Sequence, residues 1–346
     1  MYINLMIEIN KKKYVCFWLL LITFLVAIMI IVGGLTRLTD SGLSITEWQL
    51  FSGILPPLDT NDWNYYFSLY KTTSEYKLIN SSMTLEEFKV IYWWEFIHRI
   101  LGRIIGLAFI LPLIYFSWKK SIHKSFLFPL YSIFVLILIQ GLIGWYMVKS
   151  GLVDRTDVSQ YRLSLHLTVA FIIFILLLWN FLKYNDKRIN FSYKKLPFSL
   201  PLIFLLFIVF QISIGAFVSG LDAGRIYQTW PLMNESYFPD DSNFTDLFSL
   251  KVLELPSVVQ FLHRNLAYFI FFLFLLILII VFKNKDFAYL KRDTLLVFAS
   301  LVIQIFLGII TVISGAQIII ASMHQIGSII LVSTSLILVF KNSKIS

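Results

Sequence analysis

The sequence predicts an all-α integral membrane protein with eight transmembrane helices, arranged as two tandem four-helix bundles of the same orientation. Of its 346 residues, 58% are hydrophobic and only 14% are charged, which is far more apolar than a soluble globular protein. The apolar residues form eight runs, each long enough to cross a hydrocarbon core of roughly 30 Å as a helix. Because the runs are continuous rather than alternating, helices are favoured over barrel strands.

The predicted spans, with ends uncertain by several residues, are 14–33, 90–116, 126–148, 162–182, 198–219, 257–282, 294–313 and 318–340. Three lysines precede the first run as in a signal peptide, but no small-residue cleavage site follows it, so we expect an uncleaved anchor. Before the second run, Thr84 and Glu87 have the spacing of a capping box, so that helix is expected to begin outside the membrane.

The net charge of +9 reports membrane topology. With the N-terminus inside, the inner segments hold 17 lysines and arginines and the longer outer segments hold nine. The positive-inside rule therefore predicts that both termini are cytoplasmic, or in the matrix if the protein is organellar, and no nucleic-acid partner is needed to explain the basicity.

An internal repeat relates spans 1–4 to spans 5–8. Residues Gly33, Asp40, Gly42, Trp48 and Leu50 recur 182 positions later as Gly215, Asp222, Gly224, Trp230 and Leu232. Smaller offsets relate Phe96, His98, Arg99, Gln140, Gly144 and His166 to Phe261, His263, Arg264, Gln304, Gly308 and His324. An even number of spans per copy gives both copies the same direction, so we predict two bundles, 1–190 and 191–346.

Four of the five histidines, His98, His166, His263 and His324, fall one in each even-numbered span at similar depth. A single intramembrane histidine is more commonly a packing residue. Four at one depth, paired by a repeat, instead favour axial ligation of haem iron by two imidazoles in each bundle. A bare metal ion would need more carboxylates or thiols, but Glu95 alone is near and Cys16 is the single cysteine.

Haem propionates need cationic partners, and arginine pairs carboxylates in a bidentate manner. The arginines expected near the outer side are Arg37, Arg99, Arg155, Arg162, Arg225 and Arg264. Of these, Arg37, Arg99, Arg225 and Arg264 are the candidate propionate contacts. The alternative for each is a side chain that extends from a helix end to the lipid headgroups.

Glu95 distinguishes the two copies. It lies three residues before His98 and therefore on the same helical face, whereas the second copy has Gln260 at the matching position. The first bundle is therefore expected to need a proton acceptor, a proton donor or a negative charge. The alternative is a structural ion pair with Arg99 or Arg103.

With these residues in view, the sequence resembles the haem A synthase family (CtaA/Cox15 type), whose members convert haem O to haem A. The resemblance covers nearly the whole chain and rests on GGLTRLTDSGLSITEW (33–48), EFIHRILGR (95–103), QGLIGWYMVKSGL (140–152), HLTVA (166–170), GAFVSGLDAG (215–224), QTWPLM (228–233), FLHR (261–264) and MHQ (323–325). Residues 33–89 contain no cysteine, so the chain is similar to the branch without an outer-loop cysteine pair.

The resemblance implies an oxidoreductase that turns a ring methyl of haem O into a formyl group through an alcohol. It implies that His98 and His166 hold the substrate haem, that His263 and His324 hold a permanent haem b, and that Glu95 is catalytic. It also implies a bacterial inner-membrane location with the haem sites toward the periplasm. The partners it suggests are haem O synthase, cytochrome oxidase assembly factors, an electron donor or acceptor, membrane lipid and a second copy of the chain.

Two other classes of protein share some of these features. A dihaem cytochrome b passing electrons between a quinol and a partner would also have paired histidines, but it would not need the difference between Glu95 and Gln260. A transporter is disfavoured because no pair of spans is broken by glycine or proline at matching midplane positions.

Overall fold

The computed structural model describes residues 2–48, 52–186 and 194–343. These residues are mostly helical; they contain one isolated antiparallel bridge, between Met233 and Ser236, and no named strand. Eight helices are long and apolar enough to cross a membrane. The predicted all-α membrane fold with eight spans is therefore confirmed.

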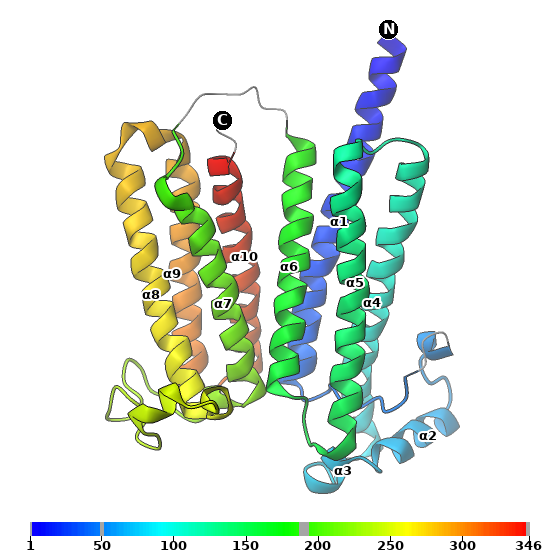
Figure 1. The fold of residues 1–346 in the computed structure, drawn as a ribbon. Coiled ribbons are helices and arrows are strands. Elements are labelled where there is room, and N and C mark those ends of the chain that lie inside the picture. The colour runs from blue at the N-terminus through cyan, green and yellow to red at the C-terminus, as the bar shows by residue number, and fades with distance from the viewer. Residues whose placement is uncertain (1, 49–51, 187–193, 344–346) are drawn as a thin grey trace. The chain divides into compact units, whose positions relative to one another are not determined.

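The membrane-length helices are α1 (Tyr2–Leu38), α4 (Leu85–Trp118), α5 (Lys124–Asp154), α6 (Gln160–Asn185), α7 (Leu200–Gly220), α8 (Pro256–Lys283), α9 (Lys291–Ile313) and α10 (Ile318–Ser343) (Figure 1). The helices α4 and α5 begin before the predicted apolar runs, where the side chains of Thr84 and His123 cap their first turns. The capping box before α4 is confirmed: Thr84 N–H donates to Glu87 Oε2 at 2.8 Å, and Glu87 N–H donates to Thr84 Oγ1 at 3.4 Å.

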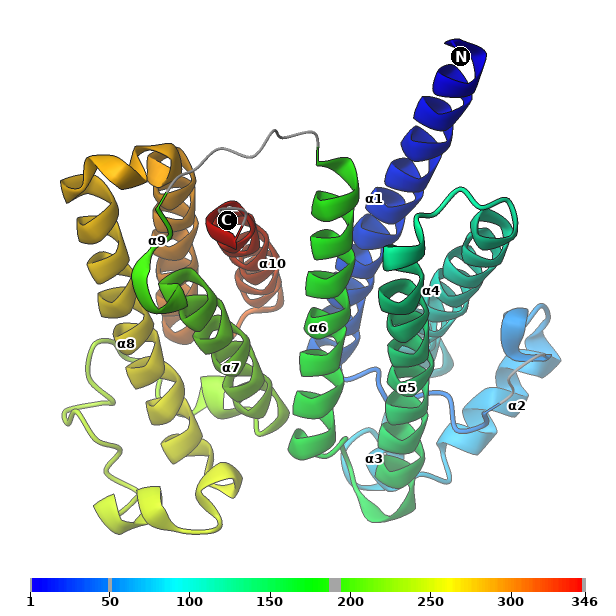
Figure 2. The ribbon, with the colours of Figure 1, turned by 45° about the horizontal axis from the view of Figure 1, so that its top comes forward.

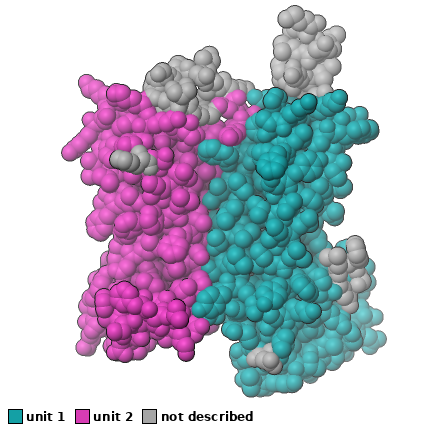
Figure 3. Space-filling model, in the orientation of Figure 1, with its two compact units in different colours: residues 1–180 teal, residues 181–346 magenta. Residues whose placement is uncertain are grey.

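The chain divides into two compact units, residues 1–180 and residues 181–346 (Figure 3). The predicted boundary between residues 190 and 191 lies outside the described residues. The common orientation of two tandem bundles stays a prediction, and each unit is described by itself below.

In the second unit, four helices pack in a closed ring. Close backbone contacts join α7 to α8, α8 to α9, α9 to α10 and α10 to α7 (Figure 2). Phe204 of α7 and Phe274 of α8 are both buried, with ring centroids 4.7 Å apart. Interlocking apolar side chains therefore fix the spacing of these helices.

In the first unit the packing is more open. The extensive backbone contacts join α1 to α4 and α4 to α5, and among the described residues α6 makes no contact of that extent with α1 or α5. Trp18 of α1 also donates from its indole Nε1–H to the Ala108 carbonyl of α4 at 2.9 Å. The helix that carries His166 is therefore less tightly packed than its counterpart α10.

The loop between α1 and α4 has a core of its own. It contains α2 (Thr60–Tyr70) and α3 (Ser74–Leu78), preceded by the short helix η1 (Ser52–Ile54). Phe88 on the first turn of α4 stacks with Phe67 and Tyr70 of α2, with ring centroids 5.0 Å and 5.2 Å apart. We call Phe67, Tyr70, Phe88 and Tyr92 the outer aromatic cluster; it fixes the outer end of α4.

Candidate functional site

His98 on α4 and His166 on α6 face each other within the first unit. Their ring centroids lie 6.5 Å apart and their planes are inclined by 70°. Two iron–nitrogen bonds of about 2 Å, together with the half-widths of two imidazole rings, span about 6 Å. The spacing of the two rings therefore fits one iron atom held between them.

Each of the four histidines lies against a glycine of the preceding membrane-length helix. A Cβ on that glycine would come within 2.9 to 3.1 Å of a ring atom, closer than side-chain atoms normally approach. The pairs are His98 with Gly33, His166 with Gly144, His263 with Gly215 and His324 with Gly308. Glycine at these four positions therefore makes room for an imidazole between two helices.

Three of these imidazoles have a nitrogen without a hydrogen-bond partner. The Nδ1 atoms of His166, His263 and His324 are buried and make no hydrogen bond within the described part of the chain. Buried polar atoms are normally paired, and an unpaired one points to a ligand or a functional role. In the second unit, His324 is close enough to His263 for charges on the two rings to interact.

The donor set suits a haem better than a bare metal ion. Within the described residues, no group of three or more histidine, cysteine, aspartate or glutamate side chains is placed to share one ion. A porphyrin supplies four nitrogen ligands of its own and needs only one imidazole on each face. The facing imidazoles of His98 and His166 therefore fit a haem in the first unit, and a haem between His263 and His324 in the second unit stays a prediction.

Glu95 is buried one turn before His98, at 2% exposure. Its Oε2 accepts hydrogen bonds from the Ser44 hydroxyl at 2.8 Å and the Ile45 N–H at 2.7 Å. Its Oε1 accepts two from Arg99, at 3.0 Å from Nε and 2.5 Å from an η nitrogen. The ion pair with Arg99 that sequence analysis offered as an alternative is therefore present, and a catalytic role for Glu95 stays a prediction.

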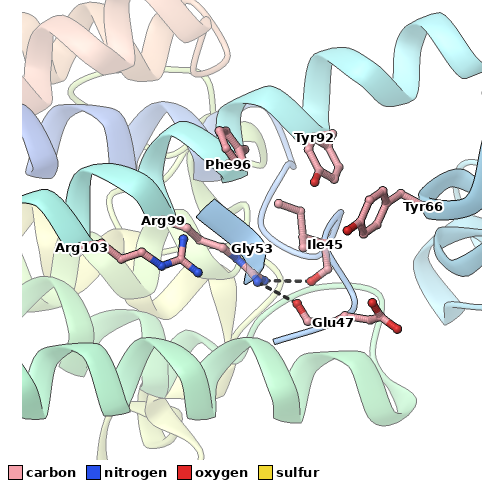
Figure 4. Close-up of a pocket in the computed structure, with 8 residues that line it drawn as sticks. All are labelled: Ile45, Glu47, Gly53, Tyr66, Tyr92, Phe96, Arg99 and Arg103. Atoms are coloured by element: carbon pink, nitrogen blue, oxygen red, sulfur yellow. Dashed lines mark hydrogen bonds between the residues drawn. The ribbon is translucent and has the colours of Figure 1, made fainter. Parts of the chain in front are cut away.

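Arg99 also holds the outer loop to α4. Its η nitrogens donate to the carbonyl oxygens of Ile45 at 2.8 Å and Glu47 at 3.1 Å (Figure 4). These contacts line a small pocket whose other walls include Tyr66, Tyr92, Phe96 and Arg103. The side chain that follows the proposed iron ligand thus anchors the loop to α4.

Arg264 makes the equivalent contacts in the second unit. It donates to the carbonyl oxygens of Tyr227 at 2.9 Å and Thr229 at 2.9 Å, which are the positions that match Ile45 and Glu47 at the offset of 182. Gln260 adds a hydrogen bond to the Tyr227 carbonyl at 3.1 Å. The internal repeat therefore extends to the individual backbone carbonyls that the two arginines bind.

The other candidate propionate contacts differ from each other. Arg37 is 9% exposed and bridges two carboxylates, Asp40 at 2.7 Å and Asp157 at 3.0 Å. Arg225 is half exposed and lies 3.8 Å from Asp222. Propionate binding by Arg37, Arg99, Arg225 and Arg264 stays a prediction, and the structure gives each of them a partner within the protein.

Sequence reasoning missed one residue of the histidine sites, Gln211. Gln140 and Gln304 stood out as a repeat pair, but the same residue also precedes Gly215 by four positions. In the structure the amides of Gln140, Gln211 and Gln304 all donate to the main chain of a histidine. The recurring pattern Gln-x-x-x-Gly was the signal that could have revealed it.

Comparison with known proteins identifies the family. Residues 16–336 match the family described as cytochrome oxidase assembly protein. The chain belongs to this family. Similar family members named "Heme A synthase" include those of Pelagibacter ubique, 48% identical over 96% of this chain and 98% of the relative, and Rickettsia felis, 42% identical over 93% and 96%. The Bartonella tribocorum relative is 41% identical over 93% of this chain and 91% of its own length. The resemblance inferred from the sequence motifs is thus confirmed.

Proposed function

We propose that the protein is a haem A synthase, an oxidoreductase that converts the ring methyl of haem O to a formyl group through an alcohol, giving haem A for cytochrome oxidase. The observation that carries the proposal is the His98–His166 pair, 6.5 Å apart and next to a buried Glu95, in a chain whose relatives are named for this enzyme. The relatives' names give no support to an electron-transfer cytochrome b.

The two units have different tasks in this proposal. Haem O binds as substrate between His98 and His166, and a resident haem b binds between His263 and His324. When bound, haem b would supply a one-electron carrier. The support for this division is chemical: the first unit has the carboxylate of Glu95, whereas Gln260 of the second uses its amide to hold the outer loop.

Glu95 acts in this scheme as a fixed negative charge. Four hydrogen bonds hold its carboxylate in one position, a single helical turn from His98. A charge that is already oriented stabilises positive charge that develops on a substrate without the cost of reorganisation. Arg99 and the loop segment at Ile45 position this carboxylate and exclude water from it.

The proposed setting is the bacterial inner membrane, with cytoplasmic termini and both haem sites toward the periplasm. The excess of basic residues in the inner segments supports this orientation. The enzyme that makes haem O and the assembly factors of cytochrome oxidase are the proposed partners, together with an electron donor or acceptor.

The test is expression in a host without haem A, with and without a haem O synthase, followed by chromatography of extracted pigments. Haem A is expected only when both proteins are present. His98→Ala and His166→Ala should abolish haem A while leaving one haem per chain, bound in the second unit. The proposal fails if the intact protein is folded and loaded with haem but haem O is recovered unchanged.

A further inference from the structure

Three of the four histidines are tied to the preceding helix by a glutamine amide. Gln140 Nε2 donates to the His166 carbonyl at 3.0 Å, Gln211 Nε2 to the His263 carbonyl at 2.9 Å, and Gln304 Nε2 to the His324 carbonyl at 3.0 Å. Each glutamine lies one turn before the glycine that faces the same imidazole. The glutamine and the glycine therefore fix one histidine together, as a repeated unit.

In the second unit the same amides also reach the imidazole rings. Gln211 Nε2 lies 3.3 Å from Nε2 of His263, and Gln304 Nε2 lies 3.5 Å from Nε2 of His324. Because an amide nitrogen can only donate, this contact must give way when Nε2 binds iron, and the restraint that persists with haem bound is the hydrogen bond to the main chain. The closed ring of helices α7 to α10 adds to this restraint.

The fourth histidine lacks this tie. The residue one turn before Gly33 is Met29, which has no hydrogen to donate. Its terminal methyl instead packs toward Gly102, one turn after His98, where a Cβ would lie 3.2 Å from it. Among the described residues, no side chain donates a hydrogen bond to the His98 carbonyl. Met29 therefore stands at the position that glutamine has in the other three sites, and it offers no donor to the His98 carbonyl.

We propose that Gln140, Gln211 and Gln304 are positioning residues for the haem ligands, and that Met29 leaves His98 as the ligand that releases its haem most readily. The inference rests on the proposed function, because only a substrate site must exchange its porphyrin during turnover. In the openly packed first unit, a glutamine holds only one of the two histidines, which suits exchange of the bound haem. Two tied ligands in a closed bundle suit a haem that stays bound.

The expected magnitude follows from the strength of a hydrogen bond between membrane helices. Such a bond changes an equilibrium or a dissociation rate by about threefold to tenfold. Adding the missing amide with Met29→Gln should slow haem loss from the first unit by this factor. Removing an amide with Gln211→Met should speed haem loss from the second unit by a similar factor.

The experiment measures haem transfer rather than catalysis. Purified full-length protein in detergent is loaded with iron protoporphyrin IX, mixed with excess apomyoglobin, and followed in the Soret band. His98→Ala and His263→Ala assign the fast and slow phases to the two units. Met29→Leu, which has similar volume and no donor, is the matched control and should leave the fast phase unchanged.

A spectroscopic readout separates positioning from general stability. Ligation by two imidazoles gives a low-spin haem, so Gln211→Met should increase the high-spin fraction of the second unit alone. The inference is wrong if Met29→Gln and Gln211→Met both insert, bind two haems and leave rates and spin states as in the original protein. If the original protein shows no low-spin haem at all, the proposed function fails instead.

Discussion

Arg99 and Glu95 form a buried ion pair one turn apart on α4, with 2.5 Å between the closest nitrogen and oxygen. The same arginine binds two carbonyl oxygens of the outer loop, and the same carboxylate accepts a hydrogen bond from the loop's Ile45 N–H. Because both partners hold the loop, their pairing links this loop to the helix that carries His98. A substitution of Glu95 that removes its charge but keeps its shape would separate its role as a charge from its role in holding the loop.

Glu95→Gln should retain the loop contacts and lose the charge. The amide oxygen can still accept from Ser44 and Ile45, but the amide nitrogen faces Arg99 and cannot accept its two hydrogen bonds. Arg99 keeps its two loop carbonyls, so we expect a folded protein with normal haem content. Formation of haem A should fall by about a hundredfold, the usual effect of removing a catalytic charge or proton-transfer group. Pigment extraction after co-expression with a haem O synthase measures both quantities, and undiminished haem A would assign Glu95 a purely structural role.

Arg264→Met should loosen the outer loop of the second unit. The variant keeps the apolar stem but leaves the Thr229 carbonyl without its donor and the Tyr227 carbonyl with Gln260 alone. Each carbonyl left unpaired costs about 1 to 3 kcal/mol. We expect faster hydrogen exchange at residues 226–233, measured by mass spectrometry, with exchange in α9 as the internal control. Unchanged exchange in that segment would show that Gln260 alone is enough to hold it.

Glu75 on α3 should make the outer loop sensitive to pH. Burial, assisted by the nearby charges of Asp157, Glu95 and Asp40, raises the pKa of its carboxyl from 4.5 to about 8, while a hydrogen bond from Tyr70 opposes the shift. Between pH 4.5 and 8 the carboxyl ionises in the unfolded loop but stays protonated in the folded one. Loop stability therefore falls as pH rises through this window, by up to about 1.4 kcal/mol per pH unit.

Glu75→Gln removes the titrating group and should flatten this dependence. Hydrogen exchange of α2 and α3 at pH 5 and pH 8, corrected for the intrinsic effect of pH on exchange, provides the measurement. A slope in the variant equal to that of the original protein would show that another group is responsible.

Gly144→Ala should disturb the substrate site, whereas Gly141→Ala on the same helix should not. A Cβ at position 144 would lie 2.9 Å from Cε1 of His166, while one at position 141 meets no atom within 4 Å. The ring of His166 must therefore move away from its present position. We expect loss of low-spin haem from the first unit in Gly144→Ala, with both haems retained in the control. Equal spectra for the two variants would mean that His166 moves without affecting the bound haem.

The features that the sequence predicted best are those with a periodic or local signal. Eight spans follow from hydrophobic length alone, and the start of α4 follows from the spacing of Thr84 and Glu87. The pairing of His98 with His166 was predicted from their equal depth in spans 2 and 4 of one copy of the repeat. It is matched by the short distance between their rings.

The features that the sequence did not predict depend on contacts between distant segments. Nothing in the local sequence distinguishes an arginine that binds a propionate from one that binds the carbonyls of a loop more than 30 residues away, as Arg264 does. The bridge from Arg37 to Asp157 likewise joins residues 120 positions apart. Irregular backbone has many carbonyl groups that can accept hydrogen bonds, and no residue pattern in the sequence indicates which of them an arginine will bind.

The outer aromatic cluster has a mechanical consequence for α4. From Leu85 to His98 this helix contains neither proline nor glycine, and kinks in helices arise mainly at such residues. The segment is therefore a stiff rod that is fixed by the outer aromatic cluster at Phe88 and carries the His98 imidazole at its other end. A tilt of α4 at Phe88 would therefore move the His98 imidazole with it. A partner or a lipid that displaced the N-terminal end of α4 would in this way change the geometry of the histidine pair.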